Sequence, residues 1–300
     1  MKIVLFFPDF YTEAHQTPEK GKVLVELFER HGIFCTTDYN LSPQKVDAVF
    51  CGSFMKNQHL RGWLKGESYP NLKVFHYSWD IYPFQLQGLE SPYPYWSEWW
   101  KQYVEDCRAC EEVFIPSLSC EARMQDYCGR KGFLVYAPAH TWEEPVWQGN
   151  YVLDCVRKYP DPNRNAVAES CERLNIPCVE SRNRLSWDEY KRTVAGCRFM
   201  ASAQYEASTG GLSLLEGYAL GKPVLVSDSS YHGGKEYFGP RCSTFTWGEP
   251  ASLDNMISNL WKFTGDNPNW KPPECREWVE STYNDERFVR EIAEIIKERL

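Results

Sequence analysis

The chain has 300 residues, a formal net charge of −8, and apolar and charged fractions typical of a globular protein. This length predicts two domains or one large one, and the acidic charge argues against general nucleic-acid binding, although a nucleic-acid acceptor in a local cleft stays open. The first apolar run is too short for a signal peptide, and no run of about 18 apolar residues occurs. We therefore expect a cytoplasmic protein without a membrane span.

The first half of the chain alternates short apolar runs with helical patterns. The runs predict strands at residues 2–8, 33–37, 46–51, 72–77, 113–116 and 133–137, and helices at 18–31 and 118–128. Strands that alternate with helices predict a parallel sheet covered on both faces, with ligands at the carboxyl ends of the strands. His15 follows the first predicted strand, and His76 and Asp80 lie at the end of the fourth.

The second half continues the same pattern after a joint rich in Pro and Trp at residues 137–149. Further strands are predicted at residues 151–156, 176–180, 197–201, 223–226 and 242–246, and helices up to about 174 and at 187–194, 212–220, 253–263 and 287–300. Three cations follow the first of these strands or precede the next helix, namely Arg157, Lys158 and Arg164.

The most informative stretch is 197–228, where a strand, a polar loop, a helix and a second strand follow one another. Gly210 and Gly211 open the helix, whose first N–H groups and dipole favour an anion, and glycine lets a phosphate approach the backbone. Glu206 and Glu216 flank this anion site, and carboxylates there suit sugar or ribose hydroxyls. This combination of an anion site and flanking carboxylates predicts that the ligand is a sugar attached to a nucleoside diphosphate.

In order, the stretch carries Glu206, then Gly210-Gly211-Leu212, then Leu215-Glu216 and finally Gly221-Lys222-Pro223-Val224. This order resembles the C-terminal signature of GT-B glycosyltransferases, especially the retaining family 4, also called glycosyl transferases group 1. Nine residues separate the two glutamates, where that family usually has seven. Glu216 therefore matches its family position more securely than Glu206 does.

The resemblance implies an α/β fold of two Rossmann-like domains that face each other across a cleft. An N-terminal, acceptor-side domain would span residues 1–140, and a nucleotide-sugar-binding domain residues 141–283. The C-terminal helix, within 284–300, would cross back onto the N-terminal domain.

The resemblance also implies site roles. Arg157 and Arg164 would bind the donor diphosphate, Glu206 the sugar and Glu216 the ribose. The other donor-binding positions are Lys158, Gly210, Gly211, Leu212 and Ser213. By the same resemblance His15, His76 and Asp80 line the acceptor side, although for His76 a buried side chain bonded to the backbone is the open alternative.

The implied reaction is transfer of a sugar, with retention and without a metal or cofactor, from a UDP- or GDP-linked donor to a glycan or another hydroxyl-bearing acceptor. The residues Arg157, Arg164, Glu206, His76 and Asp80 would form the catalytic set. Two alternatives stay open. The first is an epimerase or hydrolase of the same fold, with Asp80 and Glu206 as acid and base. The second is a sugar-nucleotide-binding protein without turnover.

Motifs of other chemistries are missing from the sequence. It has no Asp-x-Asp triplet, no GxGxxG, no P-loop and no GxSxG elbow, which argues against metal-dependent transferases, dehydrogenases, NTPases and esterases. Of the twelve cysteines, only Cys107 and Cys110 form a CxxC, and no second ligand pair stands at zinc spacing. We expect these thiols to be reduced and structural, and no metal site.

Overall fold

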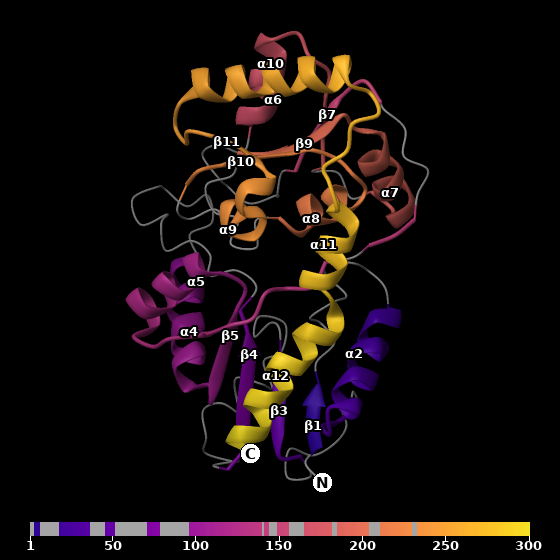
Figure 1. Ribbon diagram of the computed structural model, residues 1–300. Coiled ribbons are helices and arrows are strands. Elements are labelled where there is room, and N and C mark those ends of the chain that lie inside the picture. Colours follow the sequence, from indigo (N-terminus) through magenta and orange to yellow (C-terminus); the bar gives the residue numbers. More distant parts are fainter. Residues whose placement is uncertain are drawn as a thin grey trace. The chain divides into compact units, whose positions relative to one another are not determined.

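The computed structural model describes residues 3–6, 18–36, 46–51, 71–78, 96–139, 141–143, 149–155, 165–181, 185–203, 211–229 and 233–300. The chain divides into two compact units (Figure 1). The first unit comprises Met1–Tyr136 and Asp285–Leu300, and the second comprises Ala137–Asn284. Which of them serves an acceptor and which a donor stays a prediction.

The first unit is built on a parallel sheet in the order β2-β1-β3-β4-β5-β6. Its strands are β1 (Ile3–Phe6), β2 (Phe34–Thr36), β3 (Ala48–Cys51), β4 (Lys73–Tyr77), β5 (Glu112–Ile115) and β6 (Phe133–Leu134). Its helices are α2 (Pro18–Arg30), α4 (Trp96–Ala109), α5 (Leu118–Arg123), the π-helix η3 (Met124–Cys128) and α12 (Asp285–Arg299).

Successive side chains of a strand point to opposite faces, and both faces of this sheet are buried. Val49 and Val113 pack with Cys107 of α4 and Met124 of η3 in one cluster. Phe50, one residue further along β3, instead meets Phe28 of α2 with ring centroids 5.8 Å apart. Apolar runs without alternation therefore reflect strands that are covered on both sides.

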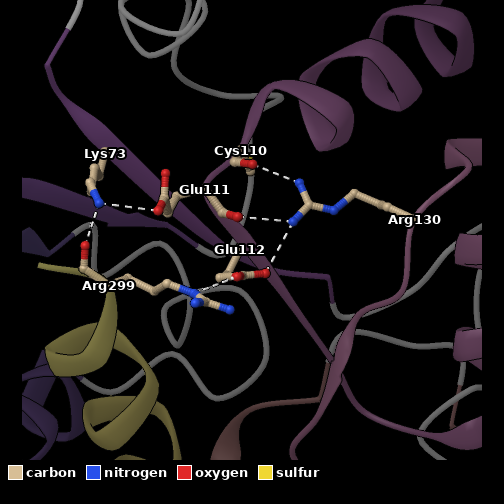
Figure 2. Close-up of polar contacts among 6 residues, drawn as sticks. All are labelled: Lys73, Cys110, Glu111, Glu112, Arg130 and Arg299. Carbon is tan, nitrogen blue, oxygen red and sulfur yellow. Dashed lines mark hydrogen bonds and ion pairs between the residues drawn. The ribbon is translucent and has the colours of Figure 1, made fainter.

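The C-terminal helix α12 belongs to the first unit and packs against α2. Figure 2 shows how its last turn is held at the amino ends of β4 and β5. The Arg299 guanidinium donates to Glu112 over 2.7 Å, and the Lys73 ammonium donates to the Arg299 carbonyl. Phe288 packs on Tyr77 with ring centroids 5.2 Å apart. The predicted return of this helix to the N-terminal unit is confirmed.

The second unit has a parallel sheet in the order β11-β10-β9-β7-β8. Its strands are β7 (Val152–Asp154), β8 (Cys178–Glu180), β9 (Phe199–Ser202), β10 (Val224–Ser227) and β11 (Ser243–Phe245). Its helices are α6 (Ala166–Arg173), α7 (Trp187–Gly196), α8 (Leu212–Ala219), α9 (Gly234–Phe238), the 3-10 helix η4 (Gly239–Arg241), α10 (Pro250–Asp266) and α11 (Cys275–Thr282).

Helices α6 and α10 share one face of the second sheet, where Val167 and Ile257 pack on Phe199 and Leu225. Parallel strands in each half of the chain were expected from the alternation of strands and helices. Some details differ from the sequence prediction. The helix predicted at 118–128 turns into a π-helix after Arg123, and neither α9 nor α11 was predicted.

Candidate functional site

The order of the second sheet reverses between β7 and β9. From β7 the chain moves outward to β8, and it then returns to β9 on the other side of β7. At such a reversal the connections after the two central strands leave in opposite directions, which opens a ligand position at their carboxyl ends. Asp154 ends β7 there and is 2% exposed, and α8 follows β9. The candidate site lies at this edge of the sheet.

Helix α8 begins with the geometry that the glycine pair predicts. Gly211 has φ +78° and ψ 102°, and its carbonyl accepts a hydrogen bond from the Leu214 N–H over 2.8 Å. A positive φ of this size strongly favours glycine. Leu212 and Ser213 form the first turn, where the N–H groups point out of the helix and its dipole is positive.

Glu216 lies on α8 one turn after Ser213 and is 1% exposed. Its Oε2 accepts a hydrogen bond from the hydroxyl of Tyr190, on α7, over 2.5 Å. The Ser213 side chain also hydrogen-bonds the Tyr190 phenol. Two helices that are 26 residues apart in sequence at this contact therefore meet through one phenol.

The charge of Glu216 acts on the buried thiol of Cys155, the residue that directly follows β7. Burial raises the pKa of the Cys155 thiol well above its usual range, and the charges of Asp154, Cys197 and Glu216 add to this effect. Burial likewise raises the pKa of Tyr190, helped by the Glu216 charge and the hydrogen bond between them. Tyr190 consequently stays protonated at neutral pH and acts as a donor to the carboxylate.

Tyr190 and Asp154 are the two residues of this edge that sequence reasoning missed. A signal for Tyr190 was present, because Ser186 and Glu189 form a capping box in which each side chain bonds the other residue's backbone N–H. That motif fixes where α7 begins and so places Tyr190 in its first turn. Asp154 carries no local signal beyond its position at the end of an apolar run.

In the first unit, His76 lies on β4 and is 1% exposed. Its Nδ1 is 3.1 Å from the Cys51 carbonyl oxygen, and its Nε2 is 3.0 Å from the Tyr103 hydroxyl. The carbonyl can only accept, so Nδ1 carries the proton and Nε2 accepts from Tyr103. Ser78 then donates to the Tyr103 oxygen over 2.6 Å. Burial lowers the pKa of His76 to about 3, so the ring is neutral at physiological pH.

The predicted site residues thus fall into three groups. Gly211, Leu212, Ser213 and Glu216 share one helix, and His76 has the buried, backbone-bonded environment that was left open as its alternative. The remaining predicted residues lie outside the described part of the chain, namely His15, Asp80, Arg157, Lys158, Arg164, Glu206 and Gly210. Their roles stay predictions.

None of the twelve cysteines, all of which lie in the described part of the chain, forms a disulfide. Cys107 of α4 and Cys110, just after it, are buried in the core of the first unit. Within the described ranges, no three His, Cys, Asp or Glu side chains gather as a group able to hold a metal ion. In the same part of the chain, no helix has the length and apolar character needed to cross a membrane.

Comparisons with known proteins find solved structures that share this fold. No family model matches the chain, and neither does any curated protein. Among solved structures, it resembles Anabaena HepE in complex with UDP and glucose, with 11% identity, a TM-score of 0.67 and coverage of 99% of this chain and 100% of that one. It also resembles sucrose-phosphate synthase from Thermosynechococcus elongatus, with 13% identity, a TM-score of 0.67 and coverage of 99% and 98%.

A third similar structure is WaaG, a glycosyltransferase involved in lipopolysaccharide biosynthesis, with 11% identity, a TM-score of 0.61 and coverage of 98% of this chain and 99% of that one. At these identities the likeness establishes a shared fold. The predicted GT-B fold class is confirmed, including the two α/β units and the returning C-terminal helix.

Proposed function

We propose that this protein is a glycosyltransferase that moves a sugar from a nucleoside-diphosphate sugar to an acceptor hydroxyl. The observation that carries the proposal is a glycine-started helix that follows β9 at the reversal of the strand order and carries the buried carboxylate of Glu216. The start of α8 suits a phosphate, and a carboxylate suits ribose hydroxyls. The shared fold with a protein crystallised with UDP supports a nucleoside diphosphate.

In the proposed reaction, the bond between the anomeric carbon and the diphosphate oxygen breaks, and its electron pair stays on the diphosphate. The acceptor oxygen bonds to the anomeric carbon, and its proton passes to the departing phosphate oxygen. Arg157, Lys158, Arg164 and the Gly210-Gly211 helix start stabilise the growing negative charge. Fixed donors aimed at a developing charge are among the largest contributions to catalysis.

Retention at the anomeric carbon and turnover without a metal or cofactor are part of the proposal. Glu206 contacts the transferred sugar, and His15 and Asp80 contact the acceptor, a glycan or another hydroxyl-bearing molecule. His76 supports the acceptor side as a neutral hydrogen-bonding group. A histidine with a pKa near 3 cannot serve as a base at neutral pH, and the proposed proton transfer to phosphate needs none.

The first test is thermal unfolding with a panel of UDP-, GDP-, ADP- and CMP-sugars in the presence of EDTA. Ligand at about 100 times its dissociation constant adds about 2.7 kcal/mol to the free energy of unfolding. We expect one nucleotide to raise the melting temperature and Arg157→Ala to abolish that shift. Arg173→Ala is the matched control, because Arg173 pairs with Asp254 on the surface over 2.7 Å.

No shift with any nucleotide sugar would refute the donor site. If a donor binds, the product made with glycan acceptors is examined by NMR for its anomeric configuration. Donor consumption without any acceptor would instead indicate hydrolysis or epimerisation. Binding without turnover over a broad acceptor panel would indicate a protein that only binds sugar nucleotides.

A further inference from the structure

The contact between Tyr190 and Glu216 fixes the carboxylate more firmly than a surface hydrogen bond could. The phenol donates to Oε2 over 2.5 Å, and Glu216 is 1% exposed. A hydrogen bond from a neutral donor to a buried carboxylate is short and strong because little water competes with it. The phenol therefore selects one orientation of the Glu216 side chain.

Tyr190 is itself held in place by its neighbours. Its ring stacks on Trp187, with centroids 5.5 Å apart and planes at 22°, and lies 5.9 Å from the Trp142 ring. The Trp142 carbonyl accepts from Arg276 of α11 over 3.4 Å, which ties this loop to another helix. Together with the capping box at the start of α7, these contacts leave the phenol little freedom.

The hydroxyl is also oriented from the other side. Ser213 hydrogen-bonds the Tyr190 phenol, and Ser213 and Glu216 lie one turn apart on the same face of α8. Since a phenol has one proton, donation to Glu216 leaves its oxygen to accept from Ser213. The direction of both hydrogen bonds is thereby fixed: the Tyr190 hydroxyl keeps its proton and donates it in a hydrogen bond to the Glu216 carboxylate.

We propose that Tyr190 is a positioning residue that sets the preference of the donor site for ribose by orienting the Glu216 carboxylate. This inference rests on the proposed function, in which Glu216 accepts hydrogen bonds from the ribose hydroxyls. A carboxylate that is already held in one rotamer loses no further conformational entropy when it binds two vicinal hydroxyls. In this proposal Tyr190 acts through its hydrogen bond to Glu216.

The test compares the binding of UDP and GDP with that of their 2′,3′-dideoxy analogues by calorimetry. Wild type should bind the ribonucleotide at least tenfold more tightly, which is the effect of losing hydrogen bonds to a charged group. Tyr190→Phe should weaken ribonucleotide binding about tenfold and leave dideoxynucleotide binding unchanged, so that the preference disappears. Glu216→Gln should do the same, and the double variant should lose no more than either single one.

Tyr151→Phe is the matched control. The Tyr151 hydroxyl donates to the Thr193 carbonyl of the same helix α7 over 2.7 Å, so this variant removes a tyrosine hydrogen bond from the next turn of the helix that does not involve Tyr190 or Glu216. It should keep the ribose preference. Dideoxynucleotide binding by Tyr190→Phe also reports that the variant is folded.

The outcomes separate the inference from the proposed function. If wild type binds no nucleotide of the UDP, GDP, ADP and CMP panel, the donor site is refuted and the role of Tyr190 falls with it. If wild type prefers ribose and Tyr190→Phe keeps that preference, only the role of Tyr190 is overturned. An equal loss of both kinds of nucleotide would show that Tyr190 is merely structural, which also overturns it.

Discussion

Acidification should lower the free energy of unfolding because His76 is buried as a neutral ring. Its pKa lies near 3 in the folded protein because burial disfavours the charged ring, against an ordinary value of 6.5. Between these values the unfolded chain binds more protons than the folded one, so the free energy of unfolding falls as the pH falls. The stability from the neutral ring is complete above pH 6.5 and is lost progressively below it. From pH 7 to pH 5 this one group should lower the free energy of unfolding by about 2 kcal/mol.

The assay is urea unfolding, followed by tryptophan fluorescence, at pH 7, 6 and 5. Carboxylates also titrate at low pH, so the quantity of interest is the difference between wild type and His76→Gln. This difference should shrink by about 2 kcal/mol over the two pH units. If His76→Gln is as sensitive to acid as wild type, the ring is not buried in its neutral form.

Two further substitutions test packing and hydrogen bonding in the two units. Gly217→Ala would place a Cβ 1.8 Å from the Met200 sulfur. The resulting overpacking of about 1–3 kcal/mol should outweigh the better helix propensity of alanine and lower the melting temperature. Gly265→Ala is the control and should not lower the melting temperature, because its Cβ meets only a flexible side chain. Arg130→Met removes the donors to the carbonyls of Cys110 and Glu111, which Figure 2 shows, and to the carbonyl of Cys107. It should lower the free energy of unfolding in urea by about 3 kcal/mol, against less than about 1 kcal/mol for the exposed Arg173→Met.

Most of the fold could be predicted because its strands are buried on both faces. The run that forms β10 is buried at every position, with three apolar residues before Ser227, and is bounded by Pro223 and Asp228, so its place follows from the sequence pattern. The α8 helix was equally clear, with Gly211 before it and Gly221 after it. The strand predicted at 151–156 is shorter in the structure, where β7 comprises Val152–Asp154, although the Cys155 N–H still donates to the Ala201 carbonyl over 2.8 Å.

The elements that escaped prediction lack such signals. In α11 only Val279 is fully buried, so its sequence shows no apolar stripe of helical period. The turn into the π-helix at Met124 inserts a residue without changing the apolar pattern on either side. The contact of Tyr190 with Glu216 joins two helices, and no sequence pattern within either helix predicts a contact with the other.

The two units each bury a tyrosine hydroxyl between an ionisable side chain and a serine, but the two networks differ in charge. Tyr103 joins a neutral His76 to Ser78, and such a network adds stability without a charge to solvate. Tyr190 joins Ser213 to the carboxylate of Glu216, and a buried charge costs free energy unless donors surround it. Vicinal hydroxyls of a ligand would supply further donors to Glu216, whereas His76 gains nothing comparable. This difference favours Glu216 over His76 as the residue that meets a substrate.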